Sequence, residues 1–149
     1  MKFGLKLYST DISLIPGARE LQEKGFYDYV ELYIIPGSYR NTSERWKCFN
    51  VQFIVHAPHS FHGINFAQTD KREENLQNFN EARLFADEFG LDSIIVHSGN
   101  NGSFEEIIRQ LGLLQAYNDV FAIIKEVLVK GNLKAWLKTY PLVPLFKIR

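Results

Sequence analysis

The fold is decided by the stretch FIVHAPH at residues 53–59, which is echoed by SIIVHSG at residues 93–99. Each stretch is a run of apolar, mostly β-branched residues that ends in a histidine and then a turn. Such a run is typical of a buried parallel strand that delivers a side chain to its carboxyl end. We therefore predict parallel strands at Val51–His56 and Ser93–His97, with their terminal histidines on neighbouring strand ends.

All four histidines of the chain lie in or just after these two stretches: His56, His59, His62 and His97. Imidazole is the commonest metal ligand in proteins and a proton-transfer group near neutral pH. A single histidine at a strand end is as often a structural residue as a functional one. Four of them, gathered at two predicted strand ends, favour a functional site at that edge of the sheet.

Strands and helices alternate along the rest of the chain. Two further strands are predicted at Lys2–Tyr8 and Tyr29–Ile35. The first predicted helix is capped by Asp11 or Ser13, has Pro16 in its first turn and stops at Gly25. The other predicted helices are Thr42–Phe49, Asp70–Phe89, Phe104–Leu114 and Asp119–Val129.

This order predicts a parallel sheet covered by helices. An eight-unit barrel takes about 250 residues, so a chain of 149 residues has room for about half of one. We expect an α/β fold in a single domain, residues 1–149: a partial (β/α)8 TIM barrel of about four β-α units. In the helix at residues 70–89 the charged residues 71–74 are expected to form a solvated first turn. Its predicted inner stripe is Leu76, Phe79, Ala82, Ala86 and Phe89.

Glu31 is the one charged residue of the strand predicted at residues 29–35. A buried carboxylate is costly without a partner, so Glu31 either faces solvent or points into a polar mouth. The loop after His56 and the turn SGNNG at residues 98–102 lie at the same predicted edge, where α/β folds build their sites. The turn either cradles an anion at the next helix or is an ordinary connection capped by Ser103.

The composition narrows the class of protein. Lys+Arg and Asp+Glu both number 17, and this neutral balance weighs against a dedicated nucleic-acid binder. Cys48 is the single cysteine and cannot form an internal disulfide. The N-terminal residues show no signal-peptide pattern, and no apolar stretch approaches the roughly 20 residues that span a bilayer. We expect a cytoplasmic protein with no membrane partner.

Four motifs together resemble a known family: GLKLYS at residues 4–9, YVEL at 29–32, VHAPH at 55–59 followed by Ile64-Asn65, and VHSG at 96–99. Over roughly residues 2–115 the chain is similar to the xylose isomerase-like barrel superfamily. That superfamily includes sugar-phosphate isomerases and epimerases, and apurinic-site nucleases of the endonuclease IV type.

The resemblance implies roles for particular residues. In the nuclease branch, the histidines that match His56 and His97 are metal ligands. In the isomerase branch, the carboxylate that matches Glu31 and the histidine after the third strand line the sugar pocket. We therefore expect a divalent metal (Zn, Mn or Mg), incompletely coordinated. The expected residues are Glu31 and His56 for catalysis, Lys6, His59, His62 and Asn65 for substrate binding, and His56 and His97 for the metal.

The resemblance fails in the C-terminal part. Family members usually end their fifth strand in Glu-Asn, and most metal ligands come from strands five to eight. Here the corresponding place reads AWLKTYP at residues 135–141, and no carboxylate occurs from Leu133 onward. If the codons of Leu137, Lys138 and Tyr140 are TTG, AAA and TAC, reading one base earlier restores Val-Glu-Asn. We therefore expect a tail that is out of frame after about residue 135, and a truncated barrel.

Three functions follow from these expectations. The first is a metal-dependent isomerase or epimerase of a sugar or sugar phosphate, weak or inactive as this fragment. The second is an endonuclease IV-like phosphodiesterase that acts on abasic DNA. This function needs a basic surface that faces the DNA, and the neutral net charge gives no sign of one. The third is a non-catalytic module. An open half barrel is also expected to self-associate, because unpaired strand edges invite pairing.

Overall fold

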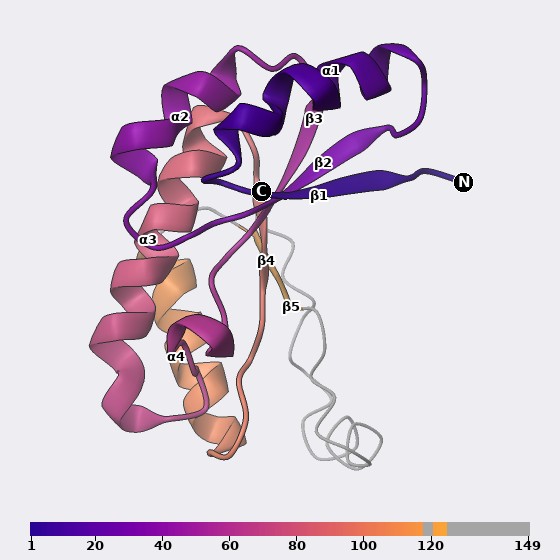
Figure 1. Ribbon diagram of the computed structural model, residues 1–149. Helices are drawn as coiled ribbons and strands as arrows, with labels where there is room; N and C mark the ends of the chain where they lie inside the picture. Colours follow the sequence, from indigo (N-terminus) through magenta and orange to yellow (C-terminus); the bar gives the residue numbers. More distant parts are fainter. Residues whose placement is uncertain (118–120, 125–149) are drawn as a thin grey trace.

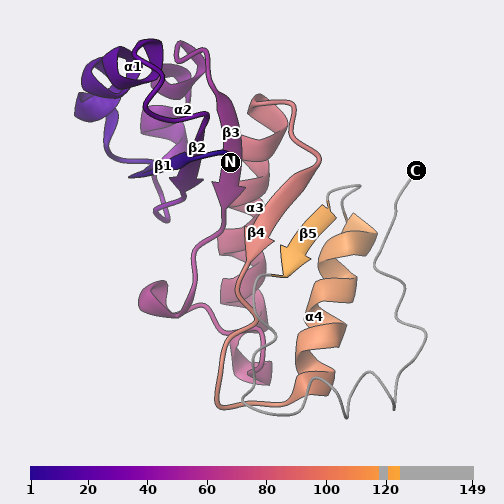
Figure 2. The same ribbon diagram turned by 90° about the vertical axis from the view of Figure 1, so that its right-hand side faces the viewer.

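The computed structural model describes residues 1–117 and 121–124, and the side chains of residues 1–114. Its centre is a parallel sheet whose strands lie side by side in chain order, which Figure 2 shows from the strand side. The five strands are β1 (Gly4–Tyr8), β2 (Tyr29–Tyr33), β3 (Gln52–His56), β4 (Ser93–Val96) and β5 (Phe121–Ile124).

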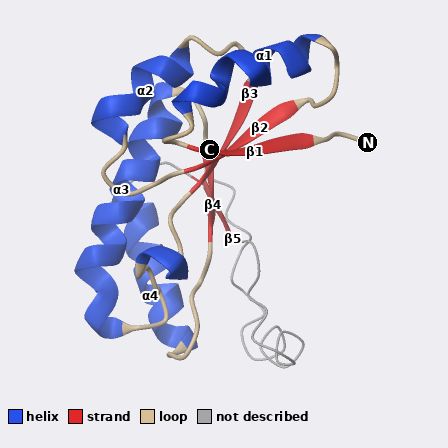
Figure 3. Cartoon of the chain, viewed as in Figure 1, coloured by secondary structure: helices blue, strands red, loops and turns tan. Residues whose placement is uncertain are grey.

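Helices connect the strands and pack to one side of the sheet (Figures 1 and 3). The α-helices are α1 (Ile15–Glu23), α2 (Tyr39–Lys47), α3 (Arg72–Glu88) and α4 (Phe104–Tyr117). Three short 3-10 helices, η1 (Ile12–Leu14), η2 (Ser60–His62) and η3 (Thr69–Lys71), lie in the connections. The predicted α/β alternation with parallel strands is therefore confirmed.

The helix predicted at residues 119–129 is wrong where the structure describes it. Residues 121–124 form β5, which pairs in parallel with β4 so that Phe121 lies opposite Ser93. A short apolar run such as FAII fits a buried strand or a buried helix equally well by periodicity, and here sheet pairing decides. The tail after about residue 135, with its proposed change of frame, lies outside the described residues.

The start of the first helix also differs from the prediction. Pro16 lies in the first turn of α1 as expected, but the N-cap is Leu14 and no side chain caps the helix. The carboxylate of Asp11 instead accepts a hydrogen bond of 2.9 Å from the main-chain N–H of Tyr8, which closes the turn after β1.

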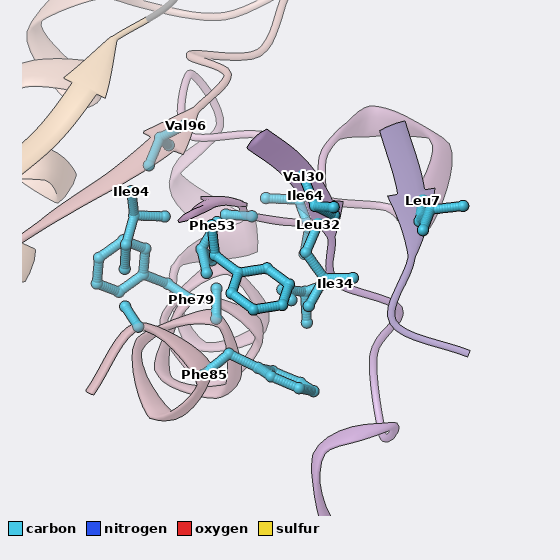
Figure 4. Packing of buried hydrophobic residues seen from close by; sticks show 14 of the residues in the cluster. Leu7, Val30, Leu32, Ile34, Phe53, Ile64, Phe79, Phe85, Ile94 and Val96 are labelled. Atoms are coloured by element: carbon cyan, nitrogen blue, oxygen red, sulfur yellow. The ribbon is translucent and has the colours of Figure 1, made fainter. Parts of the chain in front are cut away.

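Alternation along the strands builds the core. One buried cluster takes alternate strand residues: Leu7, Val30, Leu32, Phe53, Val55, Ile94 and Val96. Phe79 and Phe85 of α3 belong to the same cluster, and Figure 4 shows them beside the strands. Trp46 of α2 is fully buried, and truncating such a side chain costs about 3–5 kcal/mol. The opposite face of the same strands carries polar and aromatic side chains together with Ile54 and Ile95.

The inner face of α3 is more polar than predicted. Phe79, Ala82 and Ala86 are buried as expected, but Asn75 is buried as well. The Asn75 side-chain amide donates to Asn65 O at 2.9 Å and to Gln110 Oε1 at 2.7 Å. These bonds join α3 to α4 and to the loop after β3.

Arg72, one of the charged residues predicted to form a solvated turn, is 37% exposed but is also paired across to α4. Its guanidinium forms a bidentate ion pair with Glu106 of α4: Arg72 Nε donates to Oε1, and Arg72 Nη2 donates to Oε2 at 2.7 Å. Glu106 is only 2% exposed and also accepts a hydrogen bond from Gln110 at 2.8 Å. The hydrogen bonds from Arg72 hold the pKa of Glu106 at about 2.

Replacing Glu106 with Gln tests this buried pair through its pH dependence. The ordinary pKa is 4.5 and the folded-state pKa is about 2, so ionised Glu106 stabilises the fold fully above about pH 4.5. That contribution is lost as the pH falls towards 2. Glu106→Gln is therefore expected to lower the melting temperature at neutral pH, by a margin that shrinks below pH 4.5.

Thermal unfolding followed by circular dichroism measures this margin. Glu20→Gln is the matched control, because Glu20 pairs with Lys24 on an exposed helix surface and such pairs contribute little. A melting difference for Glu106→Gln that stays constant from neutral to acidic pH would contradict the assignment.

Candidate functional site

The face of the sheet that points away from the helices carries the candidate site. In the strand register Lys6 lies opposite Glu31, and Tyr8 lies opposite Tyr33. Tyr33 in turn lies opposite His56. Because alternate residues of a strand point to the same face, three adjacent strands present these side chains together.

Lys6, Glu31 and His56 form one hydrogen-bonded group. Lys6 Nζ donates to Glu31 Oε1 at 3.0 Å, and His56 Nδ1 lies 2.7 Å from the same oxygen. The three side chains differ in exposure: 49% for Lys6, 17% for Glu31 and 5% for His56. Glu31 therefore points into a polar mouth, one of the two alternatives left open by the sequence.

The group has a definite protonation pattern. Burial lowers the pKa of His56 to about 4, although the hydrogen bond to Glu31 opposes the shift. Burial alone would raise the pKa of Glu31, but hydrogen bonds from His56 and Lys6 outweigh it and the pKa is lowered. At neutral pH the group therefore consists of an ammonium, a carboxylate and a neutral imidazole that donates its Nδ1–H to Glu31.

A pocket of about 510 Å³ opens beside this group. Its lining includes Lys6 and Tyr8 of β1 and Tyr33 of β2, with His59, Phe61 and His62 from the segment after β3. Glu31 and His56 do not line it themselves, whereas Lys6, which is hydrogen-bonded to Glu31, does. The structure therefore brings Lys6, His59 and His62 of the predicted substrate-binding set to one pocket, with the carboxylate one hydrogen bond away.

The predicted neighbourhood of His56 and His97 is confirmed. Their rings stack almost parallel, with centroids 4.8 Å apart and an interplanar angle of 4°. The ring of His59 lies beside that of His97, with the two centroids 4.8 Å apart. Two matched runs that each end in histidine thus deliver their imidazoles to one side of the sheet.

The structure does not bring Asn65 to the pocket. Its side-chain amide donates to Asn100 O at 2.7 Å, and its Oδ1 accepts from the main-chain N–H groups of Ala67 and Asn100 at 3.1 and 3.2 Å. These bonds hold the loop after β3 against the turn after β4. A side chain at Gly99 would collide with Asn65, which accounts for a glycine there, at φ +91°.

The turn at residues 98–102 leads from β4 into α4. Ser103 caps α4: its Oγ accepts a hydrogen bond of 3.0 Å from Glu106 N. The main-chain N–H of Ser103 donates to Ala67 O at 2.9 Å, so this turn too is tied to the loop after β3.

The donor set can be compared with the divalent metal that the resemblance implies. His56 Nδ1 is committed to Glu31, and its buried Nε2 has no hydrogen-bond partner in the part of the chain described. That nitrogen is a suitable metal ligand. However, residues 1–117 and 121–124 contain no group of three or more His, Cys, Asp or Glu side chains placed to hold a metal. The described residues alone therefore do not fit a zinc centre, which takes three or four protein ligands.

Sequence reasoning missed two aromatic residues of the site, Tyr8 and Tyr33. A signal was present, because each stands two residues after a polar site residue on the same strand, Lys6 and Glu31. Reading the strands with a period of two from those residues would have found both. Thr10 and Phe61 also line the pocket, but they lie outside the strands, and no periodicity identifies them.

Comparisons with known proteins bear on the fold. No protein-family model matches the chain, and no curated protein matches it at a significant level. A solved structure described as a D-tagatose 3-epimerase-like protein is similar, with a TM-score of 0.54 and 20% sequence identity. The match covers 83% of this chain and 52% of that one, so the chain spans about half the length of the solved structure.

At this identity the likeness establishes the fold alone: parallel strands alternating with helices, as in about half of that epimerase-like protein. The α/β fold of parallel strands and connecting helices that the sequence predicts is thereby confirmed. Separately, none of the helices that the structure describes is both long enough and apolar enough to cross a bilayer.

The charges of Lys6 and Glu31 predict that removing either one shifts the pKa of His56, in opposite directions. Lys6→Met removes a nearby positive charge and is expected to raise the pKa of His56 from about 4. Glu31→Gln removes the carboxylate that favours the imidazolium and is expected to lower it further. A proton NMR titration of the imidazole ring measures both shifts. Lys24→Met, on the exposed pair with Glu20, is the control and is expected to leave His56 unchanged. Shifts of the same sign in the two site variants would refute the arrangement.

Proposed function

We propose that this chain carries a sugar-binding site of the isomerase and epimerase class, in which a proton is moved on a carbon next to a carbonyl group. The observation that carries the proposal is the Lys6–Glu31–His56 group, which lies beside a pocket in a fold shared with an epimerase-like protein. Free sugars and sugar phosphates are both ligands of this class.

The chemistry of the group supports proton transfer. Glu31 stays ionised at neutral pH and partly exposed, so it is available as a general base, although its lowered pKa weakens its basicity. Lys6 reaches from Glu31 to the pocket and is suited to hold the oxygen of a carbonyl or enolate. His56 is nearly buried, and its role in the proposal is to orient the carboxylate.

The lining of the pocket supports a polyhydroxylated ligand. Tyr8, Tyr33 and Phe61 offer aromatic surface, and Lys6, His59 and His62 offer polar groups. A small number of placed polar groups against apolar walls is the usual make-up of a small-molecule site. Asn65 has no part in this proposal, because its side chain is engaged between two loops.

The endonuclease-like function remains the alternative. The observation in its favour is the stacked pair His56–His97, since the matching histidines of that branch bind metal. The neutral charge balance of the chain speaks against DNA as its partner. Cleavage of a duplex with one abasic site, in the absence of any action on sugars, would favour the nuclease.

Hydrogen exchange in D₂O tests proton transfer directly. We expect the protein to catalyse slow loss of the proton NMR signals next to the carbonyl of D-tagatose, with and without added Mg²⁺. Glu31→Gln is expected to reduce this exchange by at least about a hundredfold, the usual contribution of a general base. Glu20→Gln is the control and is expected to exchange like the wild type, because Glu20 lies on the exposed surface of α1.

Binding of the sugar is measured in parallel by saturation-transfer NMR. Sugar binding without exchange would reject catalysis and favour the non-catalytic module. The absence of both binding and exchange would reject the sugar site as a whole.

Metal dependence is a separate part of the proposal. If His56 and His97 hold a divalent cation together with donors outside the described residues, replacing either with Ala weakens binding by at least about tenfold. Calorimetric titration with Zn²⁺ or Mn²⁺ measures this, and far-ultraviolet circular dichroism checks that the variants fold. Equal binding by the wild type and both variants would show that the two histidines are structural.

A further inference from the structure

Tyr33 occupies an unusual position in the site. It is only 3% exposed, yet it is a polar residue at the centre of a cluster of rings. The rings of His56 and His59 lie edge-on to it at 5.2 Å, and that of Tyr8 at 5.5 Å. Lys6 Nζ lies over its ring, 5.5 Å from the centroid. These contacts fix the ring, and with it the direction of the hydroxyl.

The hydroxyl of Tyr33 has two partners of different kinds. The main-chain N–H of His59 donates to it at 3.2 Å, and a main-chain N–H has no other role available. His62 Nδ1 lies 2.9 Å from the same oxygen. An imidazole nitrogen either donates or accepts, so the geometry alone leaves two arrangements.

Burial decides between them. If His62 Nδ1 carried the proton, the Tyr33 oxygen would accept twice and its own hydrogen would lack an acceptor among the described residues. An unmade hydrogen bond of a buried hydroxyl is costly. If the Tyr33 hydroxyl donates to Nδ1, the hydroxyl hydrogen and the main-chain hydrogen of His59 both have a partner. The neutral His62 ring then carries its proton on Nε2.

We infer that Tyr33 is a positioning residue that fixes the tautomer of His62, so that His62 offers its Nε2–H to a ligand as a hydrogen-bond donor. His62 lines the pocket, and Nδ1 is engaged by Tyr33, which leaves Nε2 for the ligand. A donor at this place recognises a hydroxyl or carbonyl oxygen. This second step rests on the proposed function, whereas the tautomer itself does not.

Nitrogen NMR of the imidazole rings tests the tautomer without any ligand. In ¹⁵N-labelled protein at mildly alkaline pH, His62 Nδ1 is expected to resonate as an unprotonated nitrogen and Nε2 as a protonated one. The spectrum of His62→Gln assigns the signals. In Tyr33→Phe both nitrogens are expected to move towards the averaged values of two exchanging tautomers. Tyr29→Phe removes a hydroxyl from the opposite end of β2 and is expected to leave them unchanged.

The outcomes separate the inference from the proposed function. Protonated Nδ1 in the wild type, or unchanged shifts in Tyr33→Phe, would overturn the role of Tyr33. If Tyr33→Phe does not fold, the wild-type spectrum alone decides. For the ligand step, Tyr33→Phe is expected to weaken D-tagatose binding about three- to tenfold, and not at all when His62 is already Gln. Failure of the wild type to bind D-tagatose would reject the proposed function, while the nitrogen shifts would still decide the tautomer.

Discussion

The carboxylate of Glu31 is the contact on which the candidate site depends. One oxygen takes hydrogen bonds from Lys6 on the strand before it and from His56 on the strand after it. Without that charge, an ammonium from β1 and an imidazole from β3 would face each other across β2 with no counter-charge between them, since Lys6 Nζ and His56 Nδ1 are only 3.4 Å apart. The carboxylate therefore makes three neighbouring strands into one site.

The fold supplies the geometry that this contact needs. Parallel pairing in register sets Lys6 opposite Glu31, and the alternation of side chains sends both away from the helices. Val30 and Leu32, the apolar residues on either side of Glu31 in β2, are buried against the helices, and their burial fixes the strand register. A slip by one residue would bury Glu31 among those helices, so packing on one face fixes the polar arrangement on the other.

Much of this arrangement was predictable from local patterns. The two runs that end in histidine predicted strands with neighbouring ends, and the stacked rings of His56 and His97 confirm it. Glu31 was correctly singled out as a charged residue in an apolar strand, but only its partners on other strands show which way it points. Tyr33 was missed because a tyrosine in a strand looks like ordinary core.

Other features of the structure could not be predicted from local sequence patterns. Arg72 looked like a surface charge, because its partner Glu106 lies 34 residues further along the chain. Asn65 follows a motif that implied substrate binding, whereas its amide holds two loops together. The apolar run at residues 121–124 suits a helix and a strand equally, and its pairing with β4 makes it a strand. In each case a contact between distant segments decided what the local sequence left open.

The pKa of Glu31 is the most direct measurement of the central claim. It is read from the ¹³C chemical shift of its carboxyl carbon during a pH titration, with the signal assigned from Glu31→Gln. If His56 and Lys6 hold the carboxylate as described, the pKa lies below the ordinary value of 4.5 and rises in Lys6→Met. A pKa at or above 4.5 in the wild type would mean that burial dominates and that the three residues do not form one site.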